Sequence, residues 1–291
     1  MLQHIYFSNE GCRLLGAYHR PADEAKRQPI GIIMLHGWAG YRIGAHQMFT
    51  KLARTAEAAG FFCLRFDFRG RGDSEGEAAA TTLSTMISDT VAAVDWLVAT
   101  TGLERIALVG DCSGAEVAIG AGPLRPQIES LVLWSAPMVG ADRTESDRAK
   151  KWYIVKQYLR KLFLRATWAK LFTRRLRFGM IKKALVSGGK GAGEEGAEED
   201  EQIDWVQRFV RFPGEVLFIY GGNDPTAKEC ISYYKSLSRQ AQRAFSSHIV
   251  PGSNHAFYSV SWEEEVMTVT LDWLRDQGRK VEAQLDAAAR S

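Results

Sequence analysis

The stretch Arg105-Ile106-Ala107-Leu108-Val109-Gly110-Asp111-Cys112-Ser113-Gly114 decides the fold of this chain. An apolar run typical of a buried strand leads into a pentapeptide in which two glycines flank a cysteine, and small and apolar helix-forming residues follow. The pattern predicts a strand, a sharp turn and a helix, with the thiol of Cys112 at the apex. This arrangement is a nucleophile elbow that carries Cys where most such enzymes carry Ser.

The turn of such an elbow is so tight that the residues two before and two after the nucleophile must be nearly free of side chains. A Cβ there would strike the neighbouring backbone. Gly110 and Gly114 meet this condition around Cys112. If Ser113 were the nucleophile, the crowded positions would carry an Asp and an Ala. We therefore favour Cys112, and the alternatives are Ser113 as nucleophile or Cys112 as an ordinary buried cysteine.

Length and composition predict an ordinary globular protein. The chain has 291 residues, with 46% hydrophobic and 24% charged residues, enough for one large α/β domain with an insertion or for two small domains. No apolar stretch reaches the roughly 18 residues that span a bilayer, and the N-terminus has no signal-peptide pattern, so we expect a cytoplasmic protein. The four cysteines show no CxxC spacing, and we expect them to be reduced.

Two hydrophobic periods alternate along the chain. Two short alternating runs separated by residues 8–11 predict an N-terminal hairpin. The further strands expected are 29–35, 61–66, 105–109, 130–134, 215–220 and 244–250, and the helices are 46–59, 83–98, from 113 onward, 227–237 and 262–275, with a frayed helical tail from 277. Strands and helices at this spacing predict an eight-stranded, mostly parallel sheet covered by helices on both faces.

This rhythm breaks at about residue 139, after the sixth strand. Residues 148–183 have a helical pattern with 13 Lys and Arg and no acidic residue, and a glycine-rich stretch and an acidic run follow at 187–201. The predicted organisation is a first core part at 1–140, a basic helical cap with an acidic low-complexity linker at 141–206, and a second core part at 207–291. Ligands of open parallel sheets bind at the carboxyl ends of the strands, where such a cap would lie.

Two later strand ends supply partners for the thiol. Asp224 follows the seventh strand, and His255 follows the eighth. A nucleophile needs a base to take its proton and an acid to orient that base. We prefer His255 to His248, because His248 lies inside a strand, and we prefer Asp224 to Asp142, the competing acid after the sixth strand.

Acyl chemistry also requires donors for a developing oxyanion. The third strand ends in His36-Gly37-Trp38-Ala39-Gly40, where Gly37 lets the chain turn so that the backbone N–H of Trp38 faces the nucleophile. The backbone N–H of Ser113, at the helix start, is the second expected donor. His36 has either a functional role or the simpler one of bracing this loop.

Other conspicuous motifs have structural explanations. The segment 67–74, Asp-Phe-Arg-Gly-Arg-Gly-Asp-Ser, is expected to hold its own loop through Asp67 and Arg69. Glycines 188–193 lack the preceding strand and the ending of a phosphate-binding loop. No His, Cys and Asp spacing indicates a metal site, and we expect no cofactor.

Five motifs together resemble the α/β-hydrolase superfamily, and they are HGWAG (36–40), DFRGRGDS (67–74), GDCSG (110–114), GGND (221–224) and GSNHAF (252–257). The chain order of nucleophile, acid and His agrees with that family. The segments 41–46, 66–76 and 222–227, the Cys elbow and the basic cap are similar to the exosortase A system-associated hydrolases of Gram-negative bacteria. Dienelactone hydrolases also use a Cys elbow.

The sequence therefore predicts a hydrolase of a small acyl ester or thioester with a Cys112, His255 and Asp224 triad and a covalent acyl-enzyme. Two alternatives remain, namely an acyltransferase on the same fold and a slow or silent member that serves as a binding protein. The basic, partly apolar cap either packs over the crevice or makes weak contact with an anionic membrane surface. Nucleic acid is not an expected partner, because no reading motif accompanies the cations.

Overall fold

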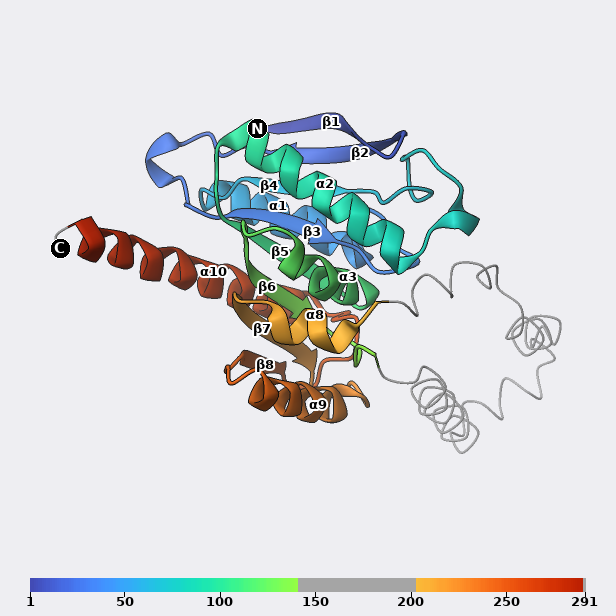
Figure 1. Cartoon of the computed structure of the whole chain (residues 1–291), viewed down its shortest axis with the longest axis vertical. Coiled ribbons are helices and arrows are strands. Elements are labelled where there is room, and N and C mark those ends of the chain that lie inside the picture. The colour runs from blue at the N-terminus through green and yellow to red at the C-terminus, as the bar shows by residue number, and fades with distance from the viewer. Residues whose placement is uncertain (141–202, 290–291) are drawn as a thin grey trace. The chain divides into compact units, whose positions relative to one another are not determined.

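The computed structural model describes residues 1–140 and 203–289, whose strands form one sheet (Figure 1). The eight strands lie in the order β1-β2-β4-β3-β5-β6-β7-β8. Their bounds are β1 (Leu2–Asn9), β2 (Cys12–His19), β3 (Gly31–Leu35), β4 (Cys63–Phe66), β5 (Ile106–Asp111), β6 (Ile128–Trp134), β7 (Glu215–Gly221) and β8 (Ser246–Val250). The mostly parallel eight-stranded sheet predicted from the sequence is confirmed.

The N-terminal hairpin is the antiparallel edge of the sheet. β1 pairs with β2 from Leu2 opposite His19 to Asn9 opposite Cys12. Glu10 and Gly11 between them have φ values of 46° and 82°, the left-handed conformation that the two central residues of a tight hairpin turn require. β2 is also antiparallel to β4, whereas β3 to β8 all run parallel. The carboxyl ends of these six strands therefore meet at one edge.

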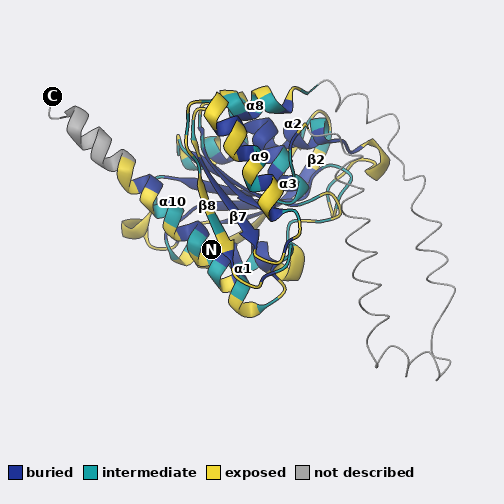
Figure 2. Ribbon diagram, turned by 90° about the horizontal axis from the view of Figure 1, so that it is seen from below, coloured by how far each residue is buried: buried dark blue, intermediate teal, exposed yellow. Residues whose placement is uncertain are grey.

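Helices cover both faces of the sheet (Figures 1 and 2). The helices α1 (Met48–Ala58) and α10 (Val260–Ala289) pack with one set of strand residues, and α2 (Leu83–Thr101), α3 (Ser113–Ala121), α8 (Trp205–Arg211) and α9 (Ala227–Gln240) pack with the other. Single turns of 3-10 helix occupy Glu24–Lys26, Ala45–Gln47, Ala78–Ala80 and Gly122–Leu124. The helix expected at 262–275 thus begins earlier and continues through the predicted tail.

The core lies in two layers, one on each side of the sheet. In β3, Ile32 and Met34 belong to the layer under α1 and α10, and Ile33 and Leu35 belong to the layer under α2 and α3. All four side chains are fully buried. Burying such a side chain contributes roughly 1.5–3 kcal/mol, which explains why this strand is apolar on both faces.

The chain divides into two compact units, Met1–Val139 with Glu195–Ser291, and Gly140–Glu194. The predicted cap at 141–206, with its basic and acidic segments, lies outside the described residues except for its last four. The last two of these four begin α8, where Trp205 and Phe209 join the core layer of α3 and α9.

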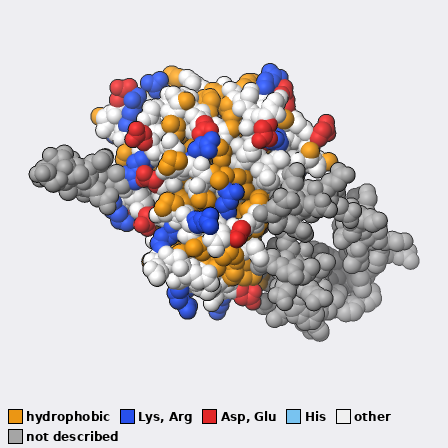
Figure 3. Space-filling model, viewed as in Figure 1, with side chains coloured by type: hydrophobic (Ala, Val, Ile, Leu, Met, Phe, Trp, Pro, Cys, Tyr) orange, Lys and Arg blue, Asp and Glu red, His pale blue; other side chains and the backbone are white. Residues whose placement is uncertain are grey.

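The described surface is mixed in charge. On the face drawn in Figure 3, acidic and basic side chains lie intermingled, with hydrophobic side chains between them. No helix within residues 1–140 and 203–289 combines the length and the apolar character needed to cross a membrane.

Candidate active site

The predicted elbow lies between β5 and α3. Cys112 has φ 54° and ψ −118°, a strained conformation for a residue with a side chain. A Cβ added to Gly110 would lie 2.3 Å from the Gly114 oxygen, and one added to Gly114 would lie 2.0 Å from the Leu35 oxygen. The two glycines are therefore required around Cys112, as the sequence argument expects. Ser113, by contrast, lies within the first turn of α3.

Asp224 and His255 meet at the carboxyl edge of the sheet, on the loops after β7 and β8. Nδ1 of His255 lies 2.7 Å from Oδ2 of the buried Asp224. Oδ1 of Asp224 accepts hydrogen bonds from the backbone N–H and the hydroxyl of Thr226, at 3.0 and 2.9 Å. Burial acts to raise the pKa of Asp224, but the hydrogen bonds from His255 and Thr226 outweigh it and leave this pKa below its usual value.

A glycine brings the two loops together. A Cβ added to Gly221, at the end of β7, would lie 2.3 Å from the Asn254 oxygen. From the other side, the hydroxyl of Ser135 donates a 2.7 Å hydrogen bond to the backbone oxygen of His255. The imidazole is thus held by its own loop and by the residue after β6.

His255 also contacts the elbow. Hydrogen bonds to Asp224 and then to Cys112 raise the pKa of His255 to about 10, against an opposing effect of burial. His255 therefore interacts with Asp224 through Nδ1 and also with Cys112. The rejected candidate His248 pairs through Nε2 with Glu265 at 2.7 Å, and the competing acid Asp142 lies outside the described residues.

The turn after β3 lies against the elbow. A Cβ on Gly37 would lie 3.2 Å from the Asp111 oxygen and 3.6 Å from the Cys112 Cβ. The backbone N–H of Trp38, expected to face an oxyanion, donates a 2.6 Å hydrogen bond to Oγ of Ser113. The sequence pattern had no signal for this contact, because it depends on the side-chain rotamer of Ser113.

His36 braces this turn. The buried ring lies with Nδ1 at 2.9 Å from the Gly37 oxygen, and Nε2 accepts the Phe68 backbone N–H at 3.4 Å, so the network places the ring proton on Nδ1. Burial lowers the pKa of His36. Both ring nitrogens of His36 contact backbone groups, which agrees with the alternative that His36 only braces this loop.

Asp111 adds a second carboxyl beside His255. Burial raises the pKa of Asp111 to about 6, and the positive charge of His255 acts in the opposite direction. The sequence argument considered this residue only as a poor flank for a nucleophilic Ser113. The signal available in the sequence was an acid directly before the cysteine.

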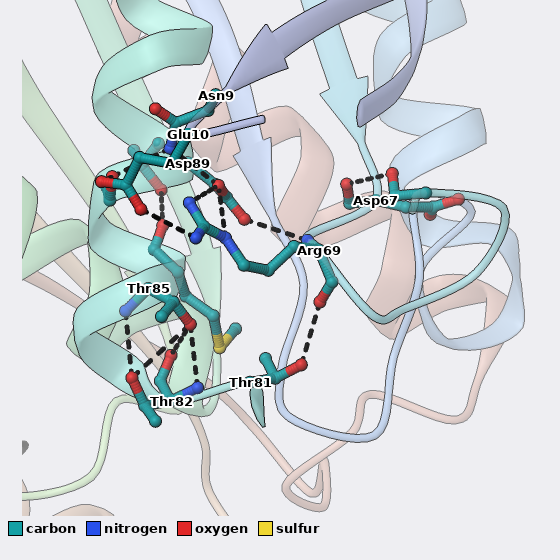
Figure 4. A network of polar contacts seen from close by, with 12 residues as sticks. Asn9, Glu10, Asp67, Arg69, Thr81, Thr82, Thr85 and Asp89 are labelled. Carbon is teal, nitrogen blue, oxygen red and sulfur yellow. Dashed lines mark hydrogen bonds and ion pairs between the residues drawn. The ribbon is translucent and has the colours of Figure 1, made fainter. Parts of the chain in front are cut away.

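The segment 67–74 is a structural network, as expected (Figure 4). Asp67 accepts the backbone N–H groups of Arg42 and Asp73, at 2.6 and 3.0 Å, and pairs with the Arg42 guanidinium. Arg69 binds Asp89 at 2.6 Å and Glu10 at 2.8 Å. These bonds tie the loop after β4 to α2 and to the hairpin turn.

No group of three or more His, Cys, Asp and Glu side chains that could hold a metal ion occurs in the described part of the chain. Cys12, Cys63, Cys112 and Cys230 are free thiols.

Two curated proteins are similar in sequence to part of this chain. Protein ABHD12B of Homo sapiens is 34% identical over 106 residues, which are 35% of this chain and 28% of that protein. The lysophosphatidylserine lipase ABHD12 of Xenopus tropicalis is 34% identical over 87 residues, which are 30% of this chain and 21% of that protein. The aligned region thus spans about a quarter of the length of these curated relatives.

Solved structures share the whole fold at low identity. An esterase of Pyrococcus furiosus has a TM-score of 0.66 at 19% identity and covers 95% of this chain and 91% of its own. Est1E of Butyrivibrio proteoclasticus with bound ferulic acid has a TM-score of 0.63 at 16% identity and covers 92% and 98%. A family model described as the alpha/beta hydrolase fold matches residues 31–261, from β3 through the elbow to the loop of His255. The chain belongs to the alpha/beta hydrolase fold family.

Proposed function

We propose that this protein hydrolyses acyl esters or thioesters through a covalent intermediate on Cys112. The observation that carries the proposal is the hydrogen bond of His255 to Asp224 together with its interaction with Cys112, whose backbone has a positive φ at the elbow. A nucleophile within hydrogen-bond reach of a base, which is itself oriented by an acid, is the arrangement that acyl transfer requires.

In the first half of the proposed reaction, the thiolate of Cys112 attacks the acyl carbon. A C–S bond forms, and the carbonyl electron pair moves to oxygen. The raised pKa of His255, about 10, keeps a proton on the imidazole near neutral pH, where it can be donated to the leaving group. The Ser113 backbone N–H at the start of α3 is one donor for the oxyanion, and the Trp38 N–H is the second when it leaves Ser113 Oγ.

Collapse of this intermediate breaks the bond to the leaving group, which takes its proton from His255. The neutral imidazole then accepts a proton from water, and the hydroxide attacks the thioester. The acid product leaves, the C–S bond breaks, and the thiol is restored. Asp224 holds the ring and stabilises the imidazolium in both halves.

The names of similar proteins support an ester as substrate. Two of the similar solved structures bear esterase names, and one curated relative is called a lysophosphatidylserine lipase. Thioesters follow from the same chemistry at an acyl carbon.

Intact-mass measurement after incubation with a panel of acyl thioesters tests the proposal. We expect an acyl adduct on the wild type and none on Cys112→Ala. An activated ester should give a burst of product at enzyme concentration. A wild type with neither adduct nor burst would act as a binding protein instead, and an adduct on Cys112→Ala would move the nucleophile.

A further inference from the structure

Among the described residues, Arg71 has no ion-pair partner, unlike the nearby arginines Arg42 and Arg69. Arg42 is paired with Asp67 and Asp73, and Arg69 is paired with Asp89 and Glu10. The Arg71 guanidinium, by contrast, makes no hydrogen bond or ion pair with any residue of the described ranges, and its Nε is buried without a partner. A buried donor without a partner costs free energy, and the half-buried guanidinium keeps donors that a ligand could use.

This guanidinium lies at the edge of the candidate active site. Its carbon lies 5.2 Å from the centroid of the Trp38 ring. The backbone N–H of the same Trp38 contacts Ser113 Oγ, directly after Cys112. The positive charge of Arg71 also acts with burial to lower the pKa of His36, in the turn that leads to Trp38. Arg71 therefore stands beside the proposed oxyanion donors.

The backbone holds Arg71 in place. Gly72 has φ 51°, and a Cβ there would lie 2.2 Å from Oδ2 of Asp67, so only glycine fits against this buried carboxylate. The Arg71 N–H donates to the Phe68 oxygen, and the Ser74 N–H donates to the Arg71 oxygen, both at 3.0 Å. The nearby carboxylates are already engaged by Arg42. The loop thus fixes the Arg71 backbone, the guanidinium lies over the Trp38 ring, and within residues 1–140 and 203–289 it has no hydrogen-bond partner.

We propose that Arg71 binds an anionic group of the substrate, a carboxylate or a phosphate, while the acyl carbon lies at Cys112. A guanidinium presents parallel N–H donors whose geometry matches the oxygens of either group, and stacking on an aromatic ring leaves those donors free. The inference rests on the proposed function for the meaning of substrate. It adds that the preferred esters or thioesters are negatively charged.

Alkylation of Cys112 tests the anion site without any turnover. The probes are N-hexyl iodoacetamide and iodoacetamidohexanoic acid, which differ in a terminal carboxylate. We expect the wild type to react faster with the acid, and Arg71→Gln to lower the ratio of acid to neutral rates by about tenfold. The matched control is Arg125→Gln, because the half-buried Arg125 pairs with Asp95 of α2 and lies just before the start of β6, away from the carboxyl ends of the strands. A ratio that Arg71→Gln leaves unchanged overturns the proposal.

Three thioesters then distinguish the source of the charge. Hexanoyl pantetheine is neutral, adipoyl pantetheine carries a carboxylate on the acyl chain, and hexanoyl phosphopantetheine carries a phosphate on the leaving group. An Arg71-dependent preference for either charged compound supports the inference and identifies the side. Equal kcat/KM for all three overturns it and leaves the proposed hydrolase intact. An Arg71-dependent alkylation ratio without any acyl adduct supports the anion site and contradicts the hydrolase.

Discussion

The backbone N–H of Trp38 donates a 2.6 Å hydrogen bond to the side-chain oxygen of Ser113. This contact joins the turn after β3 to the first residue of α3, directly beside Cys112. It occupies a donor that acyl chemistry needs. In the proposed reaction, a substrate carbonyl would compete with the Ser113 hydroxyl for the Trp38 amide, and Ser113 would adjust the proposed oxyanion site.

Replacing Ser113 by Ala should preserve acylation. The change removes the acceptor for the Trp38 N–H and keeps the backbone N–H of residue 113, so we expect an unchanged rate of adduct formation or a rise of up to about tenfold. Time-resolved intact-mass spectrometry measures this rate, with Cys112→Ala as the inactive reference. Loss of the adduct in Ser113→Ala together with its retention in Cys112→Ala would reverse the assignment of the nucleophile.

Replacing the proposed base, His255, should lower kcat/KM more than replacing the proposed acid, Asp224. We expect His255→Ala to lower kcat/KM by about a hundredfold or more, because proton transfer is lost. Asp224→Asn should have a smaller effect, since it removes the orientation of the ring and keeps the ring itself. Steady-state kinetics on one activated ester compare the two. Full activity in Asp224→Asn with loss in Asp142→Asn would transfer the acid role to Asp142.

Cys112 should be the thiol most reactive toward iodoacetamide near neutral pH. Cys63 and Cys230 are buried, and burial raises the pKa of the Cys63 thiol. Cys112 has His255 as a hydrogen-bond partner, and the pKa of that imidazole is raised to about 10. Limited labelling with peptide mapping should modify Cys112 first, and His255→Ala should slow this reaction. Earlier labelling of Cys12, Cys63 or Cys230 would be inconsistent with this site.

The elbow should not tolerate a methyl group at Gly114. A Cβ there would lie 2.0 Å from the Leu35 oxygen and 2.9 Å from the His36 oxygen, and backbone atoms cannot move aside. We expect Gly114→Ala to lower the free energy of unfolding by roughly 2 kcal/mol or more. Gly278→Ala in α10 is the control, because its added Cβ would meet Pro29 at an ordinary 3.4 Å. Equal denaturation midpoints for the two variants would contradict the steric argument.

The free energy of unfolding should decrease as the pH falls below the ordinary pKa of an imidazole. His19 is buried between Glu57, 3.0 Å from Nδ1, and Arg65, whose Nε donates to Nε2 at 3.1 Å. Burial and, to a lesser extent, the charge of Arg65 lower its pKa, although Glu57 acts to raise it. The unfolded state therefore binds a proton first, from about pH 6.5 downward, and the free energy of unfolding decreases with falling pH in that range.

Urea denaturation at a series of pH values measures this dependence. His19→Gln should show a shallower loss of stability below about pH 6.5 than the wild type. His4→Gln, on the exposed strand β1, is the matched control and should retain the wild-type slope. Identical slopes for His19→Gln and His4→Gln would remove His19 from the explanation.

The sequence by itself determined the framework of this protein. Alternating hydrophobic periods predicted the sheet and its helices, since burial of strand faces and helix stripes is a local property of the residue pattern. The elbow could also be predicted from the sequence, because the backbone around Cys112 leaves no room for a Cβ at Gly110 or Gly114. Asp224 and His255 could be proposed together, because parallel strands place their carboxyl ends at one edge.

Only the tertiary structure decided which polar groups are satisfied. The chain offers Asp67, Asp73 and Asp89 to Arg42, Arg69 and Arg71, and no pattern says that Arg71 pairs with no carboxylate of the described residues. Likewise, the Trp38 amide is engaged by Ser113 through a contact between residues 75 positions apart. Hydrogen-bond partners depend on rotamers and on distances between loops far apart in the chain. Periodicity and local propensity carry no information on either.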